Sequence, residues 1–231
     1  MLEEIEALIK EIRDPSLKKK VSNLIRKPSV KVSGRRVEFC IEESPGSLSR
    51  HHSYNGGLPQ HMIAVTRLAL FLSDLVESVY GAEVDRDVVI SASLLHDLMK
   101  PIMYSTSEDG SYVLSRLGER VDHISLVTSE LMRRNFPLDV VHAVVAHHGE
   151  FGPMRPKTLE ALIVHIADIA DSKINGEVLK AAKYLIREVE GVDVERLSPE
   201  DAFGVIKAST EEGVEGVRRY IKEKLSSYFN P

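Results

Sequence analysis

Apolar residues recur at helical spacing along most of this chain, and that period constrains the fold more than any other feature. It is clear at the start, in Ile5, Leu8, Ile9 and Ile12, which fall on one face of a helix. The Asp14-Pro15 step is typical of a helix break. Residues 2–25 are therefore predicted to form one or two amphipathic helices, interrupted near that step.

The same period predicts helices over most of the remaining chain. The strongest begins in the stretch GGLPQH, with Pro59 in its first turn, and ends at Gly81. The next covers residues 85–100 and is expected to stop at Pro101. Later helices are predicted at about residues 119–134, 137–148, 157–172, 175–190, 199–208 and 210–228. Ser198 is a good N-terminal cap for the helix at 199–208.

Two short segments change to a period of two, which is typical of strands. Residues 30–41 alternate around Ser33-Gly34, and residues 102–115 alternate around Asp109-Gly110, a pair that favours a tight turn. Strands and helices do not alternate in the way that builds a parallel sheet. The predicted fold class is all-α, with two short β-hairpins.

Composition limits the function. The 231 residues carry a formal net charge of −5, so no basic excess points to nucleic acid. A single cysteine, Cys40, excludes an intrachain disulfide and favours a reducing compartment. The start of the chain is unlike a secretory signal, and no apolar run reaches the roughly 18 residues that span a bilayer. We expect a soluble, cytoplasmic protein with no membrane partner.

The stretch SASLLHDLMKP sets His96 beside Asp97 inside an apolar run. An ionised carboxylate is costly to bury alone, so such groups are normally paired or bound to a metal. For these two residues alone, a local ion pair at a helix surface is the alternative. Five further residues of the same kinds also lie in apolar helices: His61, His123, His147, His148 and Asp168. Imidazole and carboxylate together suit borderline divalent metals, and helix bundles build such sites from facing side chains.

The order of these residues resembles the HD-domain superfamily of metal-dependent phosphohydrolases. His61, then the His96-Asp97 pair, then Asp168 follow one another on successive predicted helices. The histidines between them resemble the branch of that superfamily with two metals. The stretches HHSYNGGLPQHM, LLHDLMKP, VAHHGEFG and IVHIADIADSK are similar to the HD portion of the bacterial 3′-to-5′ exoribonucleases. The implied fold is an HD-domain helical bundle.

The resemblance covers about residues 50–175 and divides the chain into three parts. Residues 1–49 are expected to be a helical and hairpin extension, 50–175 the HD metal-binding core, and 176–231 C-terminal helices packed on the core. The chain departs from the exoribonucleases because it has no room for their nucleic-acid-binding OB domain. It also lacks the GYP signature of the HD-type cyclic-dinucleotide phosphodiesterases, since GEFGPMRPKTL follows the histidine pair.

The resemblance implies a role for each motif residue. The first metal ion would be held by His61, His96, Asp97 and Asp168. Asp97 would bridge to a second ion, held by His123 and by His147 or His148. Of that pair we favour His147 as the ligand and His148 as a catalytic group facing the substrate. Two divalent ions, whose identity stays open among Mn, Fe, Co, Ni and Zn, would lower the pKa of a bound water and supply hydroxide at neutral pH.

The substrate-binding residues are predicted around the next segment. Lys100, one turn after His96, is expected to contact the phosphate and to act in catalysis. Its alternative is a lysine that interacts with a helix dipole. Residues 102–118 are predicted to form a flap over the site, with Tyr104 or Tyr112 facing a base or sugar and Arg116 facing a phosphate. A surface ornament is the alternative for this hairpin.

Five other residues lie near the motifs and are candidates for supporting or packing roles. His51 and His52 are expected in a solvated loop, with a place behind the ligands as the alternative. His165 and Asp171 flank the last ligand at one-turn spacing and are candidates to orient ligands, although ordinary packing is slightly favoured for His165. Ordinary helix packing is predicted for His142.

The predicted function is hydrolysis of phosphate esters of small nucleotide-like substrates, with short RNA included. The alternatives are a 3′-to-5′ exoribonuclease, a di-iron HD oxygenase and a nucleotide sensor with an inactive site. The complete ligand set argues against the sensor. Long RNA is expected to be a poor substrate, because a processive enzyme normally uses a basic channel with stacking aromatic residues.

Overall fold

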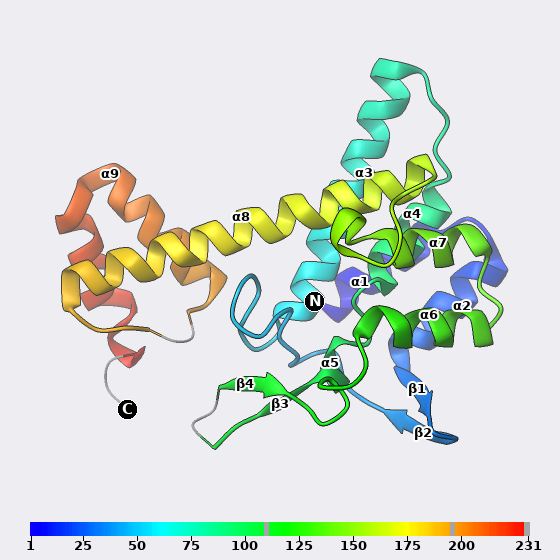
Figure 1. Cartoon of the computed structure of the whole chain (residues 1–231). Helices are drawn as coiled ribbons and strands as arrows, with labels where there is room; N and C mark the ends of the chain where they lie inside the picture. Colours follow the sequence, from blue (N-terminus) through cyan, green and yellow to red (C-terminus); the bar gives the residue numbers. More distant parts are fainter. Residues whose placement is uncertain (109–110, 195–196, 229–231) are drawn as a thin grey trace.

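The computed structural model describes residues 1–108, 111–194 and 197–228 as a helical protein with two small hairpins (Figure 1). Its helices are α1 (Leu2–Glu11), α2 (Pro15–Arg26), α3 (Gly57–Tyr80), α4 (Arg86–Leu95), α5 (Lys100–Met103), α6 (His123–Arg133), α7 (Leu138–Ala146), α8 (Leu159–Glu190) and α9 (Pro199–Lys224). Its strands are β1 (Ser29–Val32), β2 (Arg35–Glu38), β3 (Tyr104–Thr106) and β4 (Tyr112–Leu114). Short 3-10 turns follow at η1 (Gly149–Phe151) and η2 (Ser226–Tyr228). The predicted all-α fold class is confirmed.

Helices α1 and α2 are separate because Asp14 and Pro15 start a new helix. The Asp14 carboxylate accepts a hydrogen bond from the Leu17 backbone N–H at 2.7 Å, and a proline in the first turn loses no helical hydrogen bond. The Asp87 carboxylate of α4 accepts from the backbone N–H groups of Arg13 and Asp14 at 2.8 and 2.7 Å. These two hydrogen bonds hold the segment between α1 and α2 against the start of α4.

Both predicted hairpins form, each as an antiparallel pair. The first turns at Ser33 and Gly34, with φ angles of 48° and 81°, a left-handed conformation that glycine adopts at little steric cost. The second pairs residues 104–106 with residues 112–114. Its predicted turn at Asp109-Gly110 lies outside the described residues.

The predicted end of the helix before Pro101 is wrong. Helix α4 stops at Leu95, residues 96–99 form turns, and α5 begins at Lys100. Pro101 lies in the first turn of α5, where its missing N–H costs no helical hydrogen bond, so it begins a helix instead of ending one. Residues 96–99 are buried, and tertiary packing overrides helix propensity in such a stretch.

Helix α8 runs unbroken through residues 173–174, where two helices are predicted from the sequence. Asn175 and Gly176 are poor helix formers, but the Asn175 side chain is buried and hydrogen-bonded to the loop before α3. Tertiary contacts therefore outweigh the local preference. The predicted break near residue 209 lies instead at Gly213, where α9 kinks with φ 62° and ψ −145°. The predicted cap is confirmed, because the Ser198 hydroxyl accepts from the Asp201 N–H at 3.0 Å.

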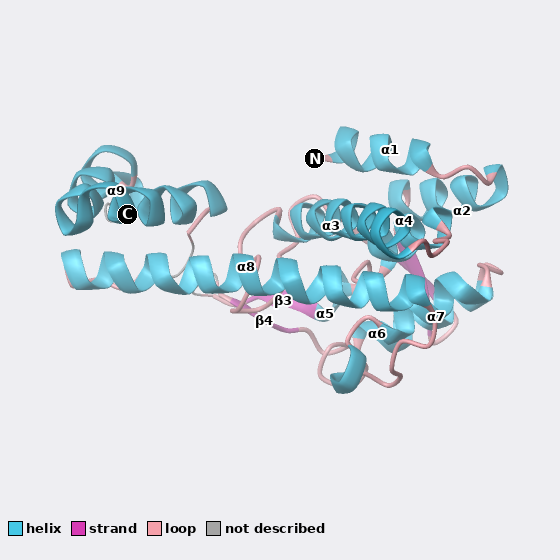
Figure 2. Cartoon of the chain, turned by 90° about the horizontal axis from the view of Figure 1, so that it is seen from above, coloured by secondary structure: helices cyan, strands magenta, loops and turns pink. Residues whose placement is uncertain are grey.

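Two apolar cores lie along α8. The larger is built from α1 to α4, α6, α7 and the first half of α8, and the smaller from α9 and the second half of α8. Figures 1 and 2 show α8 extending from the main bundle to α9 at the far end of the molecule. The N-terminal helices share the larger core with α3 and α4. The boundaries at residues 49 and 175 stay a proposal, and α8 crosses the second of them.

Helices long enough to span a bilayer occur in the chain, but none in the described residues is also apolar enough to do so.

Candidate metal centre

The first group of possible ligands lies where three distant helices meet. His61 comes from the start of α3, His96 follows the end of α4, and Asp168 lies in the middle of α8. The Nε2 atom of His61 is 3.2 Å from Nε2 of His96 and 3.2 Å from Oδ1 of Asp168. His61 and His96 are completely buried, and Asp168 is 8% exposed.

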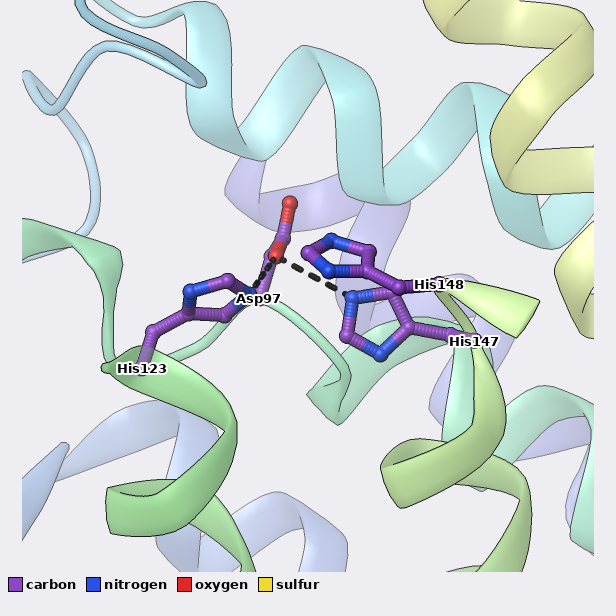
Figure 3. A group of neighbouring side chains, drawn as sticks. All are labelled: Asp97, His123, His147 and His148. Carbon is purple, nitrogen blue, oxygen red and sulfur yellow. Dashed lines mark ion pairs between the residues drawn. The ribbon is translucent and has the colours of Figure 1, made fainter. Parts of the chain in front are cut away.

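The second group surrounds Asp97, as Figure 3 shows. Nε2 of His123, the first residue of α6, lies 3.2 Å from Oδ1 of Asp97, and Nε2 of His147, just after α7, lies 3.8 Å from the same atom. The His148 ring completes the group, with its centroid 4.1 Å from that of His147 and 5.2 Å from that of His123. His147 is fully buried, whereas His148 is half-buried.

Asp97 stands between the two groups. Its Oδ2 atom is 3.3 Å from Nε2 of His61 and 3.4 Å from Nε2 of His96, while Oδ1 faces His123 and His147. The two oxygens of its carboxylate thus face different groups of possible ligands. The seven residues predicted as metal ligands from the sequence are all brought together here, and their roles stay predictions.

Hydrogen bonds at Nδ1 decide which way the buried rings face. Nδ1 of His61 is 2.6 Å from Oδ2 of Asp171, Nδ1 of His96 is 2.8 Å from the Ser93 carbonyl oxygen, and Nδ1 of His147 is 2.6 Å from the Val144 carbonyl oxygen. A carbonyl or carboxylate oxygen only accepts, so each Nδ1 carries the proton and each Nε2 points to the interior of the site.

Several inward atoms have no hydrogen-bond partner among the described residues. They are Oδ1 of Asp97, Nε2 of His123 and Nε2 of His147. A buried polar atom left unpaired is costly, and lone pairs of imidazole and carboxylate that converge on one point are what a divalent cation requires. These residues fit a metal ion.

The charges around the site agree with this fit. Burial alone would raise the pKa of Asp97, but Lys100 and His96 hold it well below its usual range. Burial lowers the pKa of His147, which keeps that ring in the neutral form that binds metals. Burial opposes a proton on His61, yet Asp168, Asp171 and Asp97 raise its pKa well above the usual value. A metal ion at Nε2 of His61 would therefore displace a proton.

The predicted substrate residues lie at different depths. Lys100 is 7% exposed, and its Nζ is 2.5 Å from Oδ2 of Asp97. It is the first residue of the four-residue helix α5. Tyr104 starts β3, is half-buried, and has its pKa raised by burial. Arg116 lies after β4 and is exposed.

The expectation of a solvated loop at His51 and His52 is wrong. His52 is 2% exposed, and its Nε2 is 2.8 Å from Oδ2 of Asp171. His51 is half-buried, and burial together with the charge of His61 lowers its pKa to about 3. Both lie close enough to His61 to form a third group of possible ligands. The alternative, a place behind the ligands, is the one that the contacts of His52 with α8 support.

Two other histidines, His165 and His142, form hydrogen bonds with backbone groups. Nδ1 of His165 donates to the His147 carbonyl oxygen at 2.5 Å, which supports the ligand-orienting alternative for His165. Nε2 of His142 accepts the Lys157 backbone N–H at 2.9 Å, so His142 ties α7 to the loop before α8, and it belongs to neither metal-ligand group.

The sequence of this chain matches known proteins. Residues 59–173 match the family described as the HD domain. The chain is 37% identical to the dihydroneopterin 2′,3′-cyclic phosphate phosphodiesterase of Methanocaldococcus jannaschii, over 98% of this chain and 91% of that protein. It is 28% identical to the 3′-5′ exoribonuclease YhaM of Shouchella clausii, over 76% of this chain and 53% of that protein. The YhaM of Listeria welshimeri is 30% identical, over 79% of this chain and 58% of that protein.

The matches differ in how completely they cover each protein. The chain spans little more than half the length of the two exoribonucleases but nearly all of the phosphodiesterase. No solved structure matches. The predicted class of enzyme, an HD-type metal-dependent phosphohydrolase, is confirmed by these relatives. The chain belongs to the HD domain family.

Proposed function

We propose that the chain is a metal-dependent phosphodiesterase that opens the 2′,3′-cyclic phosphate of a small nucleotide-like molecule to a phosphate monoester. The carrying observation is the double ligand group around Asp97 in a chain that matches a cyclic phosphodiesterase over nearly its full length. Water would add to phosphorus, one ring P–O bond would break, and the released oxygen would take a proton.

The proposed ligands follow the two groups. His61, His96, Asp97 and Asp168 would hold one ion, and Asp97, His123 and His147 a second. Divalent ions held there supply Lewis acidity toward phosphoryl oxygens and lower the pKa of bound water. Imidazole and carboxylate ligands are compatible with Mn, Fe, Co, Ni and Zn, so the ligand set leaves the native ion open.

The protein groups around the ligands have separate proposed tasks. Lys100 compensates the buried charge of Asp97 through the 2.5 Å ion pair and would stabilise a phosphate next to it. His148, half-buried beside His147, would present a ring N–H to the departing oxygen. Tyr104 is the first residue of β3 and would contact the heterocycle. Arg116 follows the end of β4 and would contact any further phosphate.

The number of ions is tested with His123. The wild-type protein is expected to bind about two divalent ions per chain, and His123→Ala to bind about one, because His123 serves only the second group. Elemental analysis of protein reloaded with a single metal gives the count. His142→Ala, which removes a histidine outside both groups, is the matched control and should keep about two ions. An active wild type with a single bound ion would reject the second site.

The substrate class is tested by comparing molecules of different size. We expect kcat/KM for 2′,3′-cyclic mononucleotides to exceed that for long single-stranded RNA by roughly tenfold or more, a barrier difference of about 1.4 kcal/mol. The net charge of −5 offers no general attraction to a polyanion. The product is a monoester, so phosphate release in a coupled phosphatase assay reports turnover.

Two outcomes of that comparison would contradict the proposal. Efficient processive degradation of long RNA would favour an exoribonuclease, in line with the partial match to YhaM. Consumption of dioxygen by the Fe(II)-loaded protein, without any phosphate product, would favour an oxygenase.

A further inference from the structure

A row of buried polar side chains lies behind His61, on the side away from the proposed ions. Oδ2 of Asp171 is 2.6 Å from Nδ1 of His61 and 2.8 Å from Nε2 of His52. Asp171 is 8% exposed and His52 is 2% exposed. The carboxylate therefore accepts two hydrogen bonds from two rings, of which only His61 belongs to the two groups proposed to hold the ions.

The hydrogen bonds continue from His52 to Tyr54. Because Nε2 of His52 donates to Asp171, its Nδ1 is an acceptor, and it lies 2.6 Å from the Tyr54 hydroxyl. That hydroxyl also lies 2.5 Å from Oε1 of Gln60, so its single proton has two acceptors within reach. The Asn175 amide closes the network, since its Oδ1 accepts the His52 backbone N–H at 2.6 Å and its Nδ2 donates to the Tyr54 oxygen at 3.2 Å. The proton positions are therefore defined from Nδ1 of His61 through the Asp171 carboxylate to Nε2 of His52, because a carboxylate only accepts.

Two elements hold this row in place. Asp168, Asp171 and Asn175 lie at one-turn intervals on α8, so a proposed ligand and two supporting residues share one face of an unbroken helix. Tyr54 is 7% exposed and belongs to the smaller core with Leu179 of α8 and residues of α9. The C-terminal helices thus pack against the outer end of the row.

We propose that Asp171, supported by His52, Tyr54 and Asn175, is a positioning residue for His61. It keeps the proton on Nδ1 of His61 and so directs Nε2 to the ions. This inference rests on the proposed role of His61 as a metal ligand. The loop before α3, together with α8 and α9, would then help to hold a metal-binding histidine in place.

The first test measures metal affinity without turnover. Metal-free protein is titrated with Co²⁺, and binding is followed by its visible absorption. Asp171→Ala is expected to weaken Co²⁺ binding by about 10- to 100-fold, as for other residues that orient a metal-bound histidine. Asp171→Asn keeps an oxygen acceptor and should restore part of the affinity. Tyr54→Phe, which preserves the ring in the smaller core, should give a smaller loss in the same direction.

The second test observes the ring directly. In Zn²⁺-loaded protein labelled with ¹⁵N-histidine, the Nδ1–H of His61 should give a signal protected from solvent exchange. The signal is assigned by its absence in His61→Gln. Asp171→Ala should remove the protection, and Asp171→Asn should retain it.

Glu130→Ala is the matched control. Glu130 is another buried carboxylate, 1% exposed, but it pairs with Arg133 and Arg134 on α6. Its loss should lower thermal stability and leave both the Co²⁺ affinity and the His61 signal unchanged. The inference is overturned if Asp171→Ala binds Co²⁺ like wild type, or if Glu130→Ala weakens binding equally. Wild-type protein that binds no Co²⁺ would instead reject the proposed function.

Discussion

Replacing Asp97 with alanine is expected to abolish hydrolysis and to lower the number of metal ions bound per chain. Oδ1 and Oδ2 of Asp97 face different groups of possible ligands, so its loss would remove the proposed shared ligand and several kcal/mol of transition-state stabilisation. That corresponds to a fall in kcat of roughly a thousandfold or more. Turnover of a 2′,3′-cyclic mononucleotide and elemental analysis of the same sample are the measurements.

The Asp97 variant has a second expected effect, on stability. Lys100 would stay buried without its carboxylate, and removal of one partner of a buried ion pair costs about 3–5 kcal/mol. Asp97→Asn, which keeps the shape of the side chain, separates lost packing from lost charge and should be inactive too. His142→Ala should keep both activity and metal content. Full turnover by folded Asp97→Ala protein would exclude Asp97 as the shared ligand.

Removing the metal is expected to inactivate the enzyme and to lower its melting temperature. Among the described residues, the buried Oδ1 of Asp97, Nε2 of His123 and Nε2 of His147 have no hydrogen-bond partner, so an ion would satisfy them. An ion at about a thousand times its Kd stabilises the folded state by about 4 kcal/mol per site. For a protein of this size, that corresponds to a rise in Tm of roughly 8–16 °C.

Calorimetry of chelated and reloaded protein measures this shift. Because the carboxylates around His61 raise its pKa well above the usual value, a metal ion must displace a proton there. Binding should therefore release protons and weaken as the pH falls. Equal melting temperatures with and without metal, at full activity, would contradict the metal site.

Much of the site could be predicted from the sequence, because each of its motifs can be recognised within a short stretch of residues. His96-Asp97, His147-His148 and Asp168 stand in apolar helical runs, and burial of such groups requires a compensating partner. The structure brings these residues together with His61 and His123. Local signals also placed the α1–α2 break, both ends of α3 and the Ser33-Gly34 turn correctly.

The tertiary structure decided what local sequence could not encode. The end of α4 at Leu95 and the continuity of α8 past Asn175 depend on contacts between distant elements. The burial of His52 depends on such a contact too. His52 stands in a loop of polar residues, and its partner Asp171 comes from the distant helix α8.

The residue types and their order thus determined the helical fold class, the residues available to bind a metal, and the family. The direction of each ring, the shared position of Asp97 and the support behind His61 came only with the fold. The physical reason is that periodicity reports which face of an element is buried. Hydrogen-bond partners across 110 to 123 residues of sequence, as in the contacts of Asp171 and Asn175, are set by packing alone.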